Sequence, residues 1–355
     1  MKNRILSISL AVLMAASISS CGNTANNTEV SAETNATSEA SISSAEGSDA
    51  EASDVSAASS ESADSKRLSI VVTNFPEYDF AHQIVQDNAD VIMLLKPGAE
   101  SHTYDPTPED IITIQNSDMF VYVGGDSDEW VDDVLSSMDQ SNMNIFRLMD
   151  AVETVPEELV EGMEENEEEE SGEEGESEEV ELDEHVWTSP VNAMTIVRKM
   201  SETIETLDPA NKDAYEKNAS DYISELSDLD KEFQDVVSSA KRKEIIVGDR
   251  FPFRYFCDEY GLSYYAAFPG CSTDTQASAK TIAFLIDKVK NDEIPVVFHI
   301  ELSNEEMCSS IAEATGAKSE LLNAVHNVSD EDFKNGVTYV NLMKHNVEVL
   351  KEALN

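Results

Sequence analysis

Residues 91–110 read VIMLLKPGAESHTYDPTPED, and the order of residue types in these twenty positions predicts a strand, a loop and a helix in succession. The apolar run at 91–95 is typical of a buried strand, and the proline and glycine that follow it predict a loop. Thr107-Pro108-Glu109-Asp110 then begins a helix, because it offers a capping residue and first-turn acids. His102 lies in the loop between them. We expect this histidine at the carboxyl edge of the sheet, where open α/β sheets bind ligands.

Strand-like and helix-like stretches alternate along the rest of the chain. The strands are predicted at 68–73, 119–123, 244–247 and 294–298. A helical stretch over Pro190–Leu207 is followed by a turn in which Asp208 caps a long helix that begins at Pro209 and ends near Ala240. The last predicted helix runs from Tyr339 to Leu354. This alternation predicts an α/β fold, with two lobes of largely parallel sheet joined by a long helical segment.

The first residues indicate export and a lipid anchor. Lys2 and Arg4 precede an apolar run, Ile5–Ile18, that is too short to span a bilayer comfortably, so residues 1–21 read as a signal peptide. The sequence ISSCG at 18–22 resembles the bacterial lipobox, in which cleavage leaves Cys21 as the lipidated first residue. The alternative is an ordinary signal peptide with an incidental cysteine. We expect the protein to be lipid-anchored at the extracytoplasmic face of the cell membrane.

Charge and composition limit the classes of partner that this protein can bind. The chain carries 23 Lys and Arg against 72 Asp and Glu, a formal charge of −49, which excludes a nucleic-acid binder and suits a cationic ligand. Residues 153–184 contain 18 acidic residues and no Lys or Arg, which predicts a solvated loop that either increases solubility or weakly captures cations. Past Cys21 the chain has Cys257, Cys271 and Cys308, which permit at most one internal disulfide.

These features divide the chain into five predicted parts. Residues 22–66 form a disordered tether of Ser, Ala and acids that follows the signal peptide. Residues 67–190 form the N-terminal α/β lobe, including the acidic block, and residues 191–240 form the linking helices. Residues 241–355 form the C-terminal α/β lobe.

Several ordered motifs resemble one known family. PGAESHTYDPTP at 97–108, DEHVWTSP at 183–190 and NFPEYDF at 74–80 are similar to segments of the solute-binding lipoproteins of zinc and manganese ABC importers. The resemblance extends over about residues 68–355. It implies two Rossmann-like lobes with a metal cleft between them, and delivery of a divalent transition metal to a membrane permease. We expect the binder to be a monomer.

The resemblance also implies metal ligands. Its two motif histidines match His102 and His185. The third family histidine is replaced by Arg250, which stays protonated and cannot bind a cation. We expect Asp249 and His326 to supply the missing ligands.

The resulting prediction is a His/His/His/Asp site, with Glu301 or Asn323 as substitutes. Three imidazoles favour zinc, whereas a site in which Glu301 replaces His326 favours manganese. In the alternative interpretation, Asp249 is a turn residue or an ion-pair partner of Arg250, and His326 is a capping histidine.

Other classes of function have weaker support in the sequence. A surface adhesin or scaffold without a transport role is the alternative from a different class, and such a protein should hold no transition metal. The sequence contains no His-Glu-x-x-His segment, no Gly-x-Ser-x-Gly elbow and no phosphate-binding glycine loop. We therefore expect a binding protein and not an enzyme.

Overall fold

The computed structural model describes residues 66–163, 181–272 and 276–355. The predicted signal peptide, Cys21, nearly all of the tether and residues 164–180 of the acidic block lie outside the described residues. Within the described residues, no helix has the length and apolar character needed to cross a membrane.

The N-terminal lobe is built on a parallel sheet with the strand order β2-β1-β3-β4. Side chains that alternate along its strands face opposite sides of the sheet. Ile70 and Val72 pack with α1 in one core, while Val71 and Phe120 pack with α2 and α3 in another. The strands are β1 (Ser69–Val72), β2 (Asp90–Met93), β3 (Met119–Tyr122) and β4 (Asn144–Arg147), and the helices are α1 (Phe75–Val85), α2 (Pro108–Gln115) and α3 (Glu129–Ser136).

The C-terminal lobe repeats this architecture with the parallel order β6-β5-β7-β8. Ile246 and Val297 pack against α7 and α8, and Ile245 and Phe298 face the larger core on the other side. The strands are β5 (Glu244–Phe251), β6 (Ser263–Pro269), β7 (Val296–His299) and β8 (Lys318–Leu321). Its helices are α6 (Arg254–Tyr260), α7 (Ala279–Asn291) and α8 (Glu306–Thr315), and the chain continues past β8 into α9 (Asp330–Lys334) and α10 (Tyr339–Ala353).

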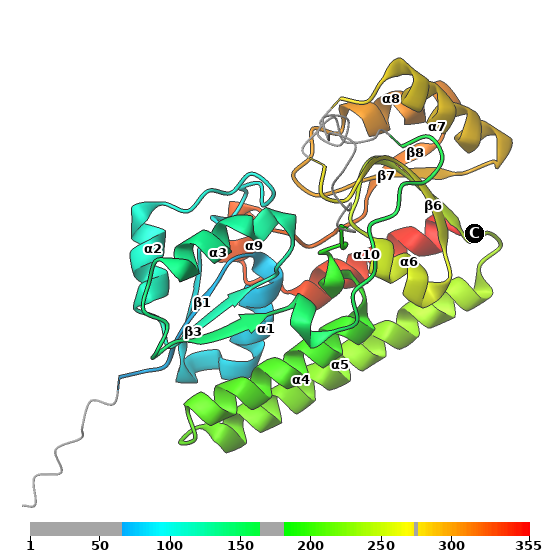
Figure 1. The fold of residues 1–355 in the computed structure, drawn as a ribbon. Coiled ribbons are helices and arrows are strands. Elements are labelled where there is room, and N and C mark those ends of the chain that lie inside the picture. The colour runs from blue at the N-terminus through cyan, green and yellow to red at the C-terminus, as the bar shows by residue number, and fades with distance from the viewer. Residues whose placement is uncertain (1–65, 164–180, 273–275) are drawn as a thin grey trace, which may run out of the picture. The chain divides into compact units, whose positions relative to one another are not determined.

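Two helices, α4 (Pro190–Leu207) and α5 (Lys212–Ser239), link the lobes and run side by side beneath both of them (Figure 1). The 28 residues of α5 extend over about 42 Å. Its buried stripe recurs at helical spacing: Tyr215, Ala219, Tyr222, Leu226, Leu229, Phe233, Val236 and Val237. The predicted fold of two α/β lobes joined by a long helix is confirmed.

The start of α5 differs from the prediction. The helix begins at Lys212 and not at Pro209, because Asp208 closes the preceding helix instead of capping the next one. Its carboxylate accepts hydrogen bonds from Asn211 Nδ2 at 2.7 Å and from the Tyr215 hydroxyl at 2.8 Å. The turn is therefore held by side chains that point back to Asp208.

The segment after β8 returns from the C-terminal lobe to the N-terminal lobe. The Gly98 N–H donates to the Val328 carbonyl at 2.8 Å, and the Phe333 ring lies 5.1 Å from the Tyr78 ring. At the start of α10, the Tyr339 N–H donates to the Asp79 carboxylate at 3.1 Å. Residues 322–339 therefore brace both lobes, which the predicted boundary of a C-terminal lobe over 241–355 did not anticipate.

The described ends of the acidic block are anchored to the protein. Pro156 and Leu182 form an isolated antiparallel bridge. The Tyr255 hydroxyl of α6 donates to the Asp183 carbonyl at 2.6 Å and accepts from the Val155 N–H at 3.2 Å. These contacts hold the first and last residues of the predicted loop against the C-terminal lobe.

Candidate metal centre

Three imidazoles from distant parts of the chain meet between the lobes. His102 lies in the loop after β2, His185 precedes the 3₁₀ turn Val186–Thr188, and His326 follows β8. Their ring centroids lie 5.0 to 5.6 Å apart, and the Nε2 atoms of His102 and His185 are 3.4 Å apart. The structure therefore brings together the three histidines that the sequence predicted.

Each imidazole is held at Nδ1 by a carboxylate. The distance is 2.9 Å from His102 to Glu100, 3.0 Å from His185 to Asp183 and 3.0 Å from His326 to Glu301. The same carboxylate oxygen also accepts the backbone N–H of its histidine in all three pairs. An acceptor at Nδ1 fixes the tautomer with the lone pair on Nε2, the arrangement found around metal-bound histidines.

Burial keeps these imidazoles neutral. It lowers the pKa of His102 to about 4, and it also lowers the pKa values of His185 and His326, against the opposing effect of the paired carboxylates. A neutral imidazole is the form that binds a metal ion. The buried Nε2 atom of His326 has no hydrogen-bond partner in the described part of the chain, which leaves its lone pair available.

Two further side chains approach the pair formed by His102 and His185. One ligand atom from each of these histidines, from Glu184 and from Cys271 lies within 4.8 Å of the other three. The Glu184 carboxylate is 3.6 Å from His102 Nε2. Burial raises the pKa of Glu184 to about 8, although the hydrogen bonds from Ser127 act in the opposite direction.

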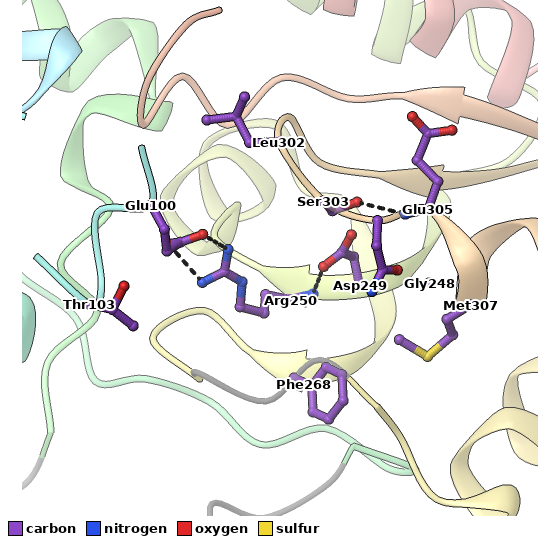
Figure 2. Close-up of a pocket in the computed structure, with 11 residues that line it drawn as sticks. Glu100, Thr103, Gly248, Asp249, Arg250, Phe268, Leu302, Ser303, Glu305 and Met307 are labelled. Carbon is purple, nitrogen blue, oxygen red and sulfur yellow. Dashed lines mark hydrogen bonds and ion pairs between the residues drawn. The ribbon is translucent and has the colours of Figure 1, made fainter. Parts of the chain in front are cut away.

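The structure does not bring Asp249 to the histidines. Figure 2 shows its carboxylate in a neighbouring pocket of about 300 Å³, where it accepts the backbone N–H of Arg250 at 2.9 Å. Within the described residues, no ion pair joins Asp249 to a histidine. The backbone at the end of β5 directs the side chain of Arg250 toward the site in its place.

Arg250 pairs with Glu100 across the lobes (Figure 2). Its Nη1 and Nη2 atoms donate to the two Glu100 oxygens at 3.2 and 2.9 Å. Arg250 Nη1 also lies 3.1 Å from His102 Nδ1, because both nitrogens donate to the same Glu100 oxygen. The guanidinium therefore stabilises the carboxylate that orients His102.

Glu301 orients a ligand and also braces the backbone. Besides His326, its carboxylate accepts the Ala324 N–H at 2.7 Å. The side-chain amide of Asn323 donates to Asn346, so Asn323 is engaged in the core of the lobe. The remaining histidines, His82, His299 and His345, lie on α1, β7 and α10.

Four groups at this site were not predicted from the sequence. Glu100 and Asp183 stand two residues before His102 and His185, and this repeated acid-x-His spacing was a signal for a carboxylate at Nδ1. Glu184 precedes His185 directly but reads as part of the acidic block. Cys271 has no signal in the sequence, because only the fold brings the end of β6 beside His185.

Known proteins are similar to this chain in sequence and in fold. Residues 70–353 match the family described as zinc-uptake complex component A, periplasmic. The high-affinity zinc uptake system protein ZnuA of Bacillus subtilis is 38% identical over 295 residues, which is 82% of this chain and 90% of that protein. The zinc-binding lipoprotein AdcA of Streptococcus pneumoniae is 32% identical over 293 residues, and the match spans 82% of this chain but 57% of AdcA.

A solved structure agrees with these matches. The Zn(II)-bound ZnuA-like domain of Streptococcus pneumoniae AdcA superposes with a TM-score of 0.67 at 29% identity, covering 81% of this chain and 99% of that domain. The family match spans most of the described residues and both lobes. The chain therefore belongs to the ZnuA family of metal-binding solute-binding proteins, as its motifs predicted.

Proposed function

We propose that this protein captures zinc outside the cytoplasm and delivers it to the permease of an ABC importer. The observation that carries the proposal is the convergence of three buried, neutral imidazoles, each paired at Nδ1 with a carboxylate. Membership of a family of zinc-uptake components supports the transport role. It also supports a binding protein over an enzyme.

The proposed ligands are the Nε2 atoms of His102, His185 and His326. The 3.4 Å separation of the first two Nε2 atoms fits neighbouring corners of a zinc tetrahedron, for which Zn–N bonds of about 2.0–2.1 Å give an edge of about 3.4 Å. A fourth donor is available from the group that contains Glu184 and Cys271. Three nitrogen donors favour zinc over manganese, which prefers oxygen ligands.

Release requires the C-terminal lobe to move away from the site. His326 is tied to both lobes, because its carbonyl accepts the Phe75 N–H at 3.3 Å and its own N–H donates to Glu301 at 2.8 Å. Arg250 and Cys271 belong to the C-terminal lobe, and the ion pair between Arg250 and Glu100 is 2.9 Å long. We infer that docking on the permease breaks this pair and uncovers the zinc.

The location follows from the same proposal. Lipidation at Cys21 would hold the protein at the extracytoplasmic face of the membrane, and residues 22–66 would let a monomer reach the permease. A surface adhesin or scaffold could share this anchor. A stoichiometric transition metal separates the two functions, because an adhesin without a transport role needs none.

The test is a competitive zinc titration of the purified chain and two variants. His326→Ala should weaken zinc binding at least tenfold, about 1.4 kcal/mol, because it removes one of three imidazoles. His345→Ala is the matched control on the exposed side of α10 and should bind zinc as the unmodified chain does. Equal affinities for all three proteins, or an unmodified chain that binds no zinc, would contradict the proposal.

A further inference from the structure

The loop that follows β6 places a thiol beside the imidazoles. Gly270 lies so close to His185 that a Cβ atom built on it would be 2.8 Å from the ring carbon Cε1. The next residue is Cys271, whose backbone N–H donates to the Glu157 carboxylate at 3.2 Å. The close approach of Gly270 to His185 and the bond from Cys271 to Glu157 hold this loop of the C-terminal lobe beside the imidazoles.

The position of the sulfur fits a metal ligand. The Sγ atom of Cys271 belongs to the group of ligand atoms from His102, His185 and Glu184 that lie within 4.8 Å of one another. A Zn–S bond is about 2.3 Å, longer than a Zn–N bond, so a sulfur corner lies farther from its neighbours than a nitrogen corner. The His326 ring lies beside this group, 5.0 Å from the His185 ring, and its buried Nε2 has no hydrogen-bond partner among the described residues.

The two candidates for the fourth position differ in their other partners. Both Glu184 oxygens accept hydrogen bonds from Ser127, one from its backbone N–H at 3.1 Å and one from its hydroxyl at 2.5 Å. A hydrogen-bonded carboxylate oxygen keeps a lone pair for a metal, so Glu184 can also act as a donor. The sulfur of Cys271 differs in having no hydrogen-bond partner of its own among the described residues.

The other cysteines have structural surroundings. Cys257 is buried in α6, and the Cys308 thiol donates to the Val297 carbonyl at 3.3 Å. All three described cysteines are free thiols. Of these three, Cys271 is the one that stands with the histidines.

We propose that Cys271 binds the cargo metal as a thiolate and completes the site formed by His102, His185 and His326. As the metal–sulfur bond forms, the S–H bond breaks and its proton passes to water. Thiolate ligands select zinc and other soft cations and discriminate against manganese. This inference rests on the proposed function and adds the residue that sets its selectivity.

The test uses cobalt as a spectroscopic substitute for zinc. The cobalt-loaded chain should show a sulfur-to-cobalt charge-transfer band in the near ultraviolet, and Cys271→Ser should abolish it. The same variant should lose at least tenfold in zinc affinity and keep its manganese affinity. Cys257→Ser is the control, and its cobalt complex should retain the band.

A second measurement needs no variant. Zinc should protect Cys271 from alkylation by iodoacetamide, as read by peptide mass spectrometry. Visible cobalt bands without the near-ultraviolet band, together with unprotected alkylation, would overturn the assignment of Cys271 while leaving zinc capture intact. A chain that binds neither cobalt nor zinc would overturn the proposed function as well.

Discussion

At the scale of single residues, the site depends on carboxylates that do not touch the metal position. Each one accepts both the Nδ1–H and the backbone N–H of its histidine, so the ring is fixed in tautomer and in direction. Partners of this kind typically contribute 10- to 100-fold to metal affinity. Glu301 adds a third bond, from the Ala324 N–H, and therefore also positions the backbone that carries His326.

This role of Glu301 predicts the effect of a conservative change. Glu301→Gln should weaken zinc binding about 10- to 100-fold, because the new NH₂ group faces an N–H donor and can no longer serve all three bonds. Asp249→Asn is the matched control, since its carboxylate accepts the Arg250 N–H and not a histidine. Isothermal titration would show the difference, and a larger loss in Asp249→Asn would contradict the assignment.

Glu77 predicts a pH dependence of stability. Burial, reinforced by the charge of Asp128, raises its pKa from 4.5 to about 8, and none of the residues that the structure describes forms a hydrogen bond with its Oε2 atom. Between these two pKa values the folded chain holds one proton more than the unfolded chain. The free energy of unfolding therefore falls as the pH rises, by up to about 1.4 kcal/mol per pH unit for this group.

Thermal denaturation at two pH values checks this predicted pH dependence of stability. Glu77→Gln should raise the melting temperature relative to the unmodified chain at pH 9 and change it little at pH 5, because Gln keeps the bond from the Thr73 hydroxyl without a charge. Glu109→Gln, at an exposed position in α2, should have no such effect. An increase in the melting temperature of Glu77→Gln that is the same at both pH values would contradict the prediction that ionisation of buried Glu77 lowers stability.

The ligand roles of His102 and His185 were predicted from motifs that resemble the importer family, and the residues around them placed each histidine in a loop before a helix. His326 was predicted from the need for a donor, and the structure places it with the other two. Asp249 was predicted on charge, but the register of β5 is irregular between Val247 and Arg250, and the Arg250 side chain is the one that reaches Glu100 and His102. Cys271 could not be predicted, because its approach depends on the register between β5 and β6.

At the scale of elements, most residues of the candidate site lie at or after the carboxyl ends of parallel strands. His326, Glu301, Arg250 and Cys271 follow or end β8, β7, β5 and β6, while Glu100 and His102 follow β2. Patterns in the sequence predicted the strands β1, β2, β3, β5 and β7 and the helices α4, α5 and α10, but not β4, β6 or β8. It could not predict the return of residues 322–339 to the N-terminal lobe, because that path depends on long-range contacts such as the one between Tyr339 and Asp79.

The loop after β6 predicts a steric effect. In Gly270→Ala the new Cβ would stand 2.8 Å from His185 Cε1 and 3.0 Å from its Nδ1, closer than real Cβ contacts. Either the ring or the loop must shift, so zinc affinity should fall at least tenfold, which a competition assay would measure. Ser263→Ala, at the exposed start of β6, should leave it unchanged. Normal zinc binding by Gly270→Ala would show that the loop is not held against the ring.

At the scale of the whole molecule, the described unit brings donors from both lobes around one buried point. The formal charge of −49 attracts cations in general but does not choose among them. In the proposed site, the choice among cations comes from the donors, which are three imidazoles with a thiol or carboxylate near two of them. Contacts such as the one from Trp187 Nε1 to the Ala324 carbonyl, at 2.8 Å, hold the segments that carry these side chains together.

X-ray absorption at the zinc edge, on the chain loaded with one equivalent of zinc, would show which atoms surround the metal and so whether His102, His185 and His326 bind it. The predicted result is one tightly held zinc per chain with three imidazole nitrogens at about 2.0–2.1 Å. The proposed thiolate would add one sulfur at about 2.3 Å. A shell of oxygen atoms without imidazole scattering, or zinc lost on desalting, would contradict the claim that His102, His185 and His326 form the zinc site.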